Sequence, residues 1–308
     1  MGLAFDKVVI WGHKLHSHTH SYIHQGFYRG FSELGYKTYW LDNSDDISSL
    51  DLSNALFITE GQVCAKMPLR ADGLYVLHNV AMTPEHRKLR AIVLQVYLDE
   101  VEKYASCKKV AECIYEDVTG KALFIPWATD LLPREIEAIE KKLPSIRKQE
   151  EIWWVGTLND GRFGNLSEIE PFQRAAEERD IPFFVSDVWV HPISDEEHRE
   201  LIAQSYLAPA IVGEWQKRVG YIPCRIFKNI SYGQLGVTNS YHVWKLFGGR
   251  VIYHPDTYQL FLEAQKALAT HTIEKQIELM EFVKNNHTYL NRISVLLDFL
   301  KKGYPECF

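Results

Sequence analysis

The 308-residue chain is poor in cysteine, and none of its five cysteines forms a CxxC pair. The odd number and wide spacing argue against a disulfide framework and favour reduced thiols in a cytoplasmic setting. No apolar run approaches the roughly 18 residues that a membrane-spanning helix needs. Residues 1–12 contain a short apolar run without a cleavage signature, so we expect a first strand there and no signal peptide. These absences predict a cytoplasmic protein with no integral membrane segment.

An excess of basic residues is also lacking, since the net charge is −6 and the pI is about 6.1. This balance argues against a protein built to bind nucleic acid. The sequence contains no GxGxxG, which disfavours a dinucleotide-binding dehydrogenase, and no HExxH, which disfavours one large class of zinc hydrolases. We therefore expect neither a dinucleotide cofactor nor this kind of zinc site.

What the chain does contain is apolar surface for a large core, at 46% hydrophobic residues, with eight tryptophans. Its first half alternates short apolar runs with an amphipathic helix that Gly35 ends, which is typical of a doubly wound α/β fold. We expect a helix over 19–34 and helical or mixed structure over 84–105. We expect strands over 7–12, 36–41, 54–59, 73–78, 111–115 and 122–125.

A second α/β half follows a linker at 126–133, which two prolines bracket. We expect helices over 134–148, 169–179 and 195–205, strands over 151–156, 182–186, 208–213, 235–238 and 251–253, and a helical tail over 260–302. The two halves have similar lengths and show no internal repeat. The predicted domains are 1–131 and 132–285, with 286–308 packing back on the first. Oligomeric state stays open.

Five histidines fall within twelve residues after the first predicted strand: His13, His16, His18, His20 and His24. Ligands of doubly wound folds bind at the carboxyl ends of strands, and a histidine there can act as a general base near neutral pH. The HxH spacing of His16 and His18 could instead hold zinc, although no cysteine lies near. The histidines could also be incidental neighbours of a helix cap at Thr19.

Of these residues, His20 and His18 are the preferred candidates for a catalytic base, because they lie closest to the helix start. His13, Lys14 and His16 are candidates for acceptor binding. Glu60 ends the third predicted strand and would reach the same edge of the sheet, where it could orient a histidine or serve as the base itself. A plain turn at Glu60 is the competing interpretation.

The second half places Arg225 and Lys228 three residues apart at the start of a short helix. Both side chains then lie on one side of the helix, and a helix start with two cations is suited to bind a phosphate. Solvated cations are the simpler alternative. Gly233 and Gly236 end this helix, and a short strand follows.

Three further segments belong to the same predicted phosphate and nucleotide site. Gly156 and Thr157 follow the first strand of the second half, where glycine lets backbone amides approach a pyrophosphate. The stretch 214–216 running into Tyr221 could hold a base or ribose, or simply bury a tryptophan. Asn239 and Ser240 end the strand after the cationic helix.

These features resemble the GT-B glycosyltransferases, which transfer a sugar from an activated nucleotide-sugar to an acceptor. The stretch Pro223-Cys-Arg-Ile-Phe-Lys-Asn-Ile-Ser-Tyr-Gly233 is similar to the Pro-Ser-Arg-x-Phe-Glu-x-x-x-x-Gly donor motif of that family. The resemblance implies two Rossmann-like domains facing a cleft, with the acceptor on the first and the donor on the second. The layout is group 1-like, or exostosin- or fucosyltransferase-like.

By this resemblance Arg225 would bind the diphosphate. Lys228 replaces the family's glutamate, which favours a second phosphate cation as in fucosyltransferase-like branches. The E-x7-E pattern of one retaining group is missing, because Gly220 and Lys228 occupy its two positions. The family implies chemistry without a bound metal, and the lack of a DxD motif agrees with it.

The sequence thus predicts a metal-independent glycosyltransferase that uses a nucleoside-diphosphate sugar and a glycan or glycoconjugate acceptor, with a histidine base in the first domain. A nucleotide-sugar epimerase, a zinc-dependent hydrolase built on the histidine cluster, and a non-enzymatic binding protein are the alternatives. The sugar, the base and the stereochemical outcome stay open.

Overall fold

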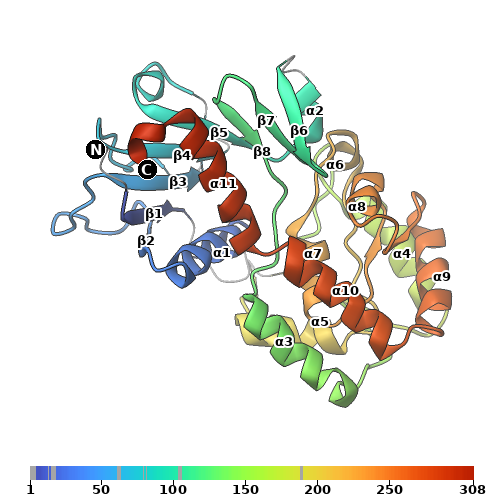
Figure 1. Ribbon diagram of the computed structural model, residues 1–308. Coiled ribbons are helices and arrows are strands. Elements are labelled where there is room, and N and C mark those ends of the chain that lie inside the picture. The colour runs from blue at the N-terminus through green and yellow to red at the C-terminus, as the bar shows by residue number, and fades with distance from the viewer. Residues whose placement is uncertain are drawn as a thin grey trace. The chain divides into compact units, whose positions relative to one another are not determined.

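The computed structural model describes residues 5–12, 14, 19–60, 64–78, 80, 82–102, 106–187 and 190–308. These residues form two compact units (Figure 1). Unit 1 comprises the described residues up to Pro126 together with Tyr289–Phe308. Unit 2 runs from Trp127 to Thr288. The chain therefore passes from one unit to the other twice, after Pro126 and after Thr288. The domain limits expected from the sequence were 131/132 and 285/286.

Unit 1 is built on an eight-stranded sheet in the order β2-β1-β3-β4-β5-β8-β7-β6. The first six strands of this order are parallel, and β7 and β6 continue it antiparallel. The strand bounds are β1 Lys7–Trp11, β2 Lys37–Leu41, β3 Ala55–Glu60, β4 Leu74–His78, β5 Arg90–Gln95, β6 Cys107–Ala111, β7 Ile114–Asp117 and β8 Ala122–Phe124. Because both faces of the central strands are covered, they read as continuous apolar runs, with every residue of β4 buried.

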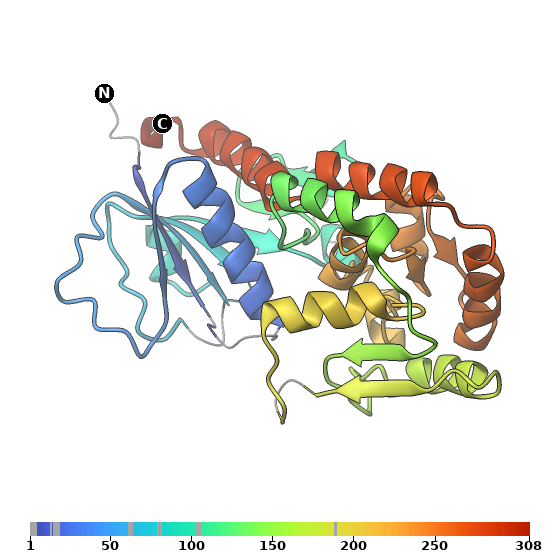
Figure 2. The ribbon, with the colours of Figure 1, turned by 90° about the horizontal axis from the view of Figure 1, so that it is seen from below.

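Two helices from opposite ends of the chain pack together in this unit, α1 (Thr19–Glu33) and α11 (Tyr289–Gly303) (Figures 1 and 2). Their close approach depends on Gly26, where a β-carbon would lie 2.2 Å from the ring of Tyr289. The buried Arg292 of α11 donates from Nε to the Pro126 carbonyl oxygen at 2.7 Å. The tail of the chain is thus an integral part of unit 1.

The other face of the sheet is covered in large part by connecting segments. Val9, Phe57 and Leu77 point to this face and pack with Leu52 and Met67, which belong to the connections before β3 and β4. The short elements η1 (His86–Lys88), α2 (Leu98–Glu102) and η3 (Pro305–Cys307) complete the described part of unit 1. The doubly wound pattern expected from the sequence is therefore realised here with loops in place of some helices.

Unit 2 has shorter strands in two parallel pairs, β9 with β10 and β11 with β12. An extended segment lies between the pairs, since Tyr206 N–H donates to the Glu151 carbonyl and Ala210 N–H donates to the Val237 carbonyl. Figure 2 shows β9 and β10 as neighbouring arrows. The strands are β9 Ile152–Val155, β10 Phe183–Ser186, β11 Val237–Thr238 and β12 Ile252–Tyr253.

The helices of unit 2 surround these strands, and α4 packs closely against α9. Ser194 begins α5 with a capping box, accepting from the Glu197 N–H while the Glu197 carboxylate accepts from the Ser194 N–H. The bounds are α3 Pro133–Lys142, η2 Leu143–Ser145, α4 Leu166–Glu177, α5 Asp195–Gln204, α6 Glu214–Arg218, α7 Cys224–Ser231, α8 Tyr241–Leu246, α9 Thr257–Leu268 and α10 Ile273–Asn286.

Three sequence expectations about local structure are wrong. Residues 90–95 form the inner strand β5 where helical or mixed structure was expected, because a short apolar run does not distinguish strand from helix. The strand expected over 111–115 spans the turn between β6 and β7, at which Cys113 has a φ of 54°. Residues 208–213 make only a single bridge, at Ala210. The expected helical tail is confirmed, and it consists of three helices, α9, α10 and α11.

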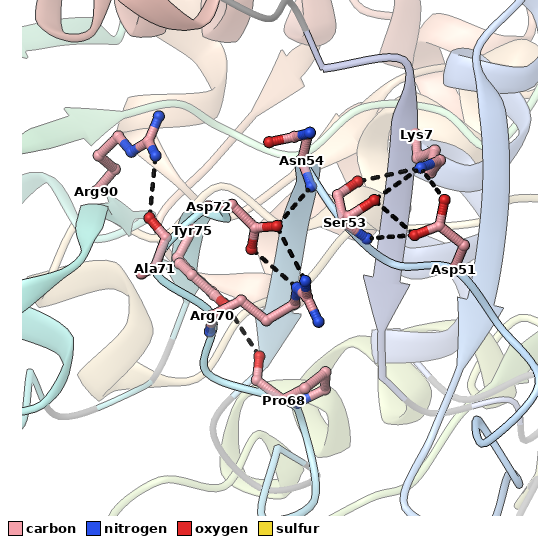
Figure 3. A network of polar contacts seen from close by, with 10 residues as sticks. All are labelled: Lys7, Asp51, Ser53, Asn54, Pro68, Arg70, Ala71, Asp72, Tyr75 and Arg90. Atoms are coloured by element: carbon pink, nitrogen blue, oxygen red, sulfur yellow. Dashed lines mark hydrogen bonds and ion pairs between the residues drawn. The ribbon is translucent and has the colours of Figure 1, made fainter.

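A polar network closes the amino-terminal edge of the sheet in unit 1 (Figure 3). Arg70 pairs with Asp72 at 2.9 Å, and the Asp72 carboxylate also accepts from the Asn54 N–H. The hydroxyl of the buried Tyr75 accepts from the Arg70 N–H at 2.6 Å and donates to the Pro68 carbonyl oxygen at 2.9 Å. This hydroxyl holds the turn before β4 in place.

Replacing Tyr75 by phenylalanine should therefore destabilise unit 1 by about 1–3 kcal/mol, because one backbone N–H and one carbonyl lose their partner. Calorimetric unfolding would measure the loss. Tyr115→Phe is the matched control, since no described residue bonds the Tyr115 hydroxyl. Equal stability of the two variants would contradict the role given to Tyr75.

Candidate functional site

The strand order of the unit 1 sheet reverses between β1 and β3. Doubly wound folds bind ligands at such a reversal, at the carboxyl edge of the sheet. Trp11 of β1 is paired with Thr59 of β3, so Gly12 and Glu60 follow on neighbouring strands. Glu60 is the last residue of β3, and His20 lies in the first turn of α1. The structure thus places the backbones of Glu60 and His20 on elements that end or begin at this edge.

Of the other residues predicted at this edge, only Lys14 is among the described residues. His13, His16 and His18 lie outside the described residues. Lys14 is described, and its Nζ lies 2.5 Å from Oδ2 of Asp45 in an ion pair. The same Asp45 oxygen accepts from the Asp42 N–H at 2.7 Å. Lys14 is thus anchored to the loop after β2, and its predicted role in acceptor binding stays a prediction.

Two buried histidines at this edge had no role in the sequence prediction. A β-carbon on Gly12 would lie 2.0 Å from Cε1 of His24, so the imidazole packs directly on the backbone at the end of β1. His78 ends β4 opposite Glu60 of β3, and its Nδ1 lies 3.3 Å from the Leu94 carbonyl oxygen. Burial lowers the pKa of His78 to about 4, so it is neutral at pH 7.

In unit 2, the first of the two predicted phosphate cations lies against the end of β9. The guanidinium carbon of Arg225 lies 3.8 Å from the centroid of the Trp154 ring. Gly156, the residue after β9, has a φ of +139°, and a β-carbon there would lie 2.7 Å from Nη2 of Arg225. The sequence predicted Gly156 and Arg225 as parts of one site, and the structure brings them into contact.

The second cation, Lys228, lies one turn further along α7 and is only 4% exposed. Burial lowers the pKa of Lys228 to about 8, and the negative charge of Asp130 acts in the opposite direction. The positive charge of Arg225 also lowers the pKa of Lys228, so the two cations interact electrostatically. Lys228 is therefore no solvated surface lysine, which was the simpler interpretation of the sequence.

Asp130 belongs to the segment that enters unit 2 and is itself fixed. The Tyr232 hydroxyl lies 2.8 Å and 2.9 Å from its two carboxylate oxygens. The neighbouring Thr129 and Ser231 hydroxyls are 2.6 Å apart, which ties the same segment to the end of α7. The geometry around Lys228 is thus determined by contacts between segments about a hundred residues apart.

His198 of α5 and Cys224 of α7 complete this buried cluster. The His198 ring meets the Tyr232 ring edge-on, with the centroids 5.9 Å apart. Burial lowers the pKa of His198 well below its usual range, and the charges of Lys228, Arg225 and Arg199 lower it further. Burial raises the pKa of the Cys224 thiol, so it stays protonated.

The remaining predicted donor residues lie near the same edge of unit 2. Thr157 follows Gly156 and is half-buried, as is Tyr221 in the turn before α7. Asn239 accepts from the Val212 N–H and donates to the Val212 carbonyl and to Glu168. Ser240 caps α8 by accepting from the Val243 N–H. Asn239 and Ser240 are used in structural bonds, and their predicted contact with a donor stays a prediction.

The sequence interpretation missed Asp130, His198 and Tyr232. A weak signal existed for two of them. Asp130 is a lone carboxylate in an apolar stretch, and His198 shares one helix face with the apolar residues Leu201 and Ile202. Nothing local marks Tyr232, since it needs a partner distant in the sequence.

Within the ranges that the structure describes, no group of three or more His, Cys, Asp or Glu side chains could hold a metal ion. Nor does any helix in those ranges have the length and apolar character to cross a bilayer.

Comparisons with known proteins place this fold. Neither a family model nor a curated protein sequence matches the chain. A solved structure of an alpha-glucosyltransferase in complex with UDP and a 13-mer DNA containing a HMU base is similar, with a TM-score of 0.63 over 97% of this chain and 100% of that one, at 8% identity. Another alpha-glucosyltransferase structure, in complex with UDP, gives a TM-score of 0.62 over 96% and 99% at 10% identity.

The N-terminal domain of Candida albicans trehalose-6-phosphate phosphatase gives a TM-score of 0.51 over 97% of both chains, at 8% identity. At such identities the likeness is one of fold. The chain has the GT-B glycosyltransferase fold, as its sequence predicted.

The lowered pKa of Lys228 predicts how the stability of the ligand-free protein depends on pH. The ammonium has a pKa of about 8 in the folded protein, against 10.5 for a lysine in an unfolded chain, so the unfolded chain binds this proton more tightly. The contribution of Lys228 to the free energy of unfolding is therefore fully present above pH 10.5, and it is lost as the pH falls towards 8. Between pH 7 and pH 9 the gain should be about 1 kcal/mol.

Urea unfolding of the wild type and of Lys228→Met at both pH values measures this gain as a difference between the two proteins. The variant lacks the titrating group but keeps a side chain of similar length. Parallel pH profiles would show that Lys228 is not held in an apolar environment.

Proposed function

We propose that this protein is a glycosyltransferase that moves a sugar from a nucleoside-diphosphate sugar to a hydroxyl group of a glycan or glycoconjugate acceptor. The observation that carries the proposal is the pair of cations Arg225 and Lys228 on α7, beside the glycine turn at Gly156, in a chain with the GT-B fold. The solved alpha-glucosyltransferases that share this fold contain UDP, which agrees with a nucleotide ligand.

In the proposed reaction, Arg225 and Lys228 stabilise the negative charge that develops on the departing nucleoside diphosphate. Cations fixed in a water-poor site are effective in this role, because no solvent has to reorganise as the charge develops. Gly156 leaves room for the Arg225 guanidinium next to the backbone, and Thr157 and Tyr221 are proposed to contact the donor as well. These groups would take the place of a metal ion, so the transfer is proposed to be metal-independent.

The base that deprotonates the acceptor hydroxyl is proposed to come from His20, His18 or Glu60. His13, Lys14 and His16 are the proposed acceptor contacts. Glu60 has one feature in its favour, namely its place at the β1/β3 reversal, opposite the buried and neutral His78.

A hydroxyl on nucleic acid is the competing acceptor class. One solved alpha-glucosyltransferase contains DNA with a HMU base, although the net charge of −6 in the present chain favours an acceptor without a phosphate backbone. The acceptor panel should therefore include such a DNA beside simple glycans. Transfer to the DNA alone would correct the acceptor class and leave the donor chemistry in place.

A thermal-shift screen with UDP, GDP, dTDP, CMP and ADP, with and without EDTA, tests the donor site first. One nucleotide should raise the melting temperature, because binding to the folded state stabilises it by mass action, and EDTA should not change the shift. No shift with any nucleotide and a lower melting temperature in EDTA would favour the zinc-dependent hydrolase. Conversion of the nucleotide-sugar without any acceptor would favour the epimerase, and binding without turnover a non-enzymatic role.

Arg225→Ala should raise the activation free energy of transfer by about 2–4 kcal/mol and so lower kcat, because it removes a hydrogen-bond donor to the leaving diphosphate. Lys245→Ala, which removes a lysine from the neighbouring helix α8, is the control and should retain full activity. The rates come from release of the nucleoside diphosphate with the donor found in the screen. If Arg225→Ala and Lys228→Ala both stay within a few-fold of wild type, the donor assignment is wrong.

Replacing the true base should reduce transfer by about 10²–10⁴-fold with little change in donor affinity. His20→Ala and Glu60→Gln separate two of the three candidates, and His24→Asn controls for damage to the end of β1. The acidic limb of the pH–rate profile should disappear only in the variant that lacks the base. If both His20→Ala and Glu60→Gln retain that limb, neither residue is the base. The same measurement on His18→Ala then shows whether His18 is the base or whether all three candidates are excluded.

A further inference from the structure

The Arg225 guanidinium stacks on the ring of Trp154. The guanidinium carbon lies 3.8 Å from the ring centroid, which is stacking distance, and the tryptophan is only 1% exposed. Trp154 is part of β9 and of an apolar cluster in unit 2, and neighbouring side chains enclose its ring. A cation that is stacked on a fixed ring loses little further freedom when it binds an anion.

The end of β9 confines the same guanidinium from the side. With a φ of +139° and no side chain, Gly156 leaves the space that Nη2 of Arg225 occupies, 2.7 Å from where a β-carbon would lie. The indole Nε1 of Trp154 lies 3.7 Å from that same point. The guanidinium and the indole N–H therefore converge on the first turn after the strand.

The indole N–H of Trp154 is the exceptional group here. It is buried, and no residue in the described part of the chain accepts its hydrogen bond. Buried N–H groups are nearly always paired, and an unpaired one carries a desolvation penalty. The neighbouring Trp153 shows the ordinary case, since its Nε1 donates to the Glu151 carboxylate at 2.7 Å. The site around Trp154 thus lacks one acceptor.

We propose that the indole N–H of Trp154 donates to a phosphate oxygen of the donor diphosphate, beside the Arg225 guanidinium. This inference rests on the proposed function and adds a tryptophan to the donor site. A phosphate oxygen is an acceptor that fits, because the Arg225 guanidinium that adjoins Nε1 at the end of β9 is a cation and attracts an anion. Ring and N–H then have separate tasks, the ring fixing the cation and the N–H binding the anion.

The test compares Trp154→Phe with Trp153→Phe. Phenylalanine keeps an aromatic face under Arg225 and removes the N–H, while the second variant removes the N–H that already has a protein partner. Titration calorimetry of each protein with UDP, with uridine and with inorganic pyrophosphate separates phosphate contacts from base contacts. If the screen selects another base, its diphosphate and nucleoside replace UDP and uridine.

Trp154→Phe should bind UDP and pyrophosphate about tenfold more weakly than wild type, because a hydrogen bond to a charged acceptor is lost, and uridine equally well. Trp153→Phe should bind all three within twofold of wild type. Unchanged affinity of Trp154→Phe for UDP and pyrophosphate would overturn the inference, and so would an equal loss for uridine, which indicates a collapsed site. If wild type binds no diphosphate at all, the proposed function itself fails.

Nuclear magnetic resonance of the ¹⁵N-labelled wild type provides a second measurement that does not depend on the folding of Trp154→Phe. The chain has eight tryptophans, and one indole N–H signal should move downfield on addition of pyrophosphate. That movement should be absent in Arg225→Ala. A spectrum in which no indole signal moves although pyrophosphate binds would overturn the inference.

Discussion

The ammonium of Lys228 inside unit 2 is the constraint on which the arrangement of that unit depends. A charge that is removed from water destabilises the folded state unless an opposite charge lies near, and here the leading compensation comes from Asp130. The Tyr232 hydroxyl contacts both carboxylate oxygens of Asp130, and Tyr232 follows directly after α7. The segment that enters unit 2 and the helix that presents the cations are therefore fixed together.

The sequence was sufficient for those parts of the site that are local. Arg225 and Lys228 stand three residues apart after a proline, so their common side of α7 follows from helix geometry alone. Asp130 and Trp154 join them from distant segments, and Asp130 and Tyr232 are 102 positions apart in the sequence. Such pairings depend on how the strands are ordered, and no spacing rule along one sequence encodes that order.

The same distinction holds for the fold. The strands β1, β3 and β4 were predictable because burial on both faces makes each a continuous apolar run between turn residues. The inner strand β5 escaped prediction because arginine and glutamine at its ends gave it the look of a mixed segment. At the carboxyl edge of unit 1, the positions of Glu60 and His20 on their elements agree with the sequence, whereas His24 and His78 emerged only from packing.

The way the chain divides between the units has a consequence for folding during synthesis. Unit 2 is one continuous segment from Trp127 to Thr288, whereas unit 1 needs α11 from the end of the chain to cover α1. Contacts across so many residues are closed late and slowly. Unit 2 can therefore reach its native packing without residues outside its own segment, while the apolar side of α1 stays uncovered until Tyr289–Phe308 have been made.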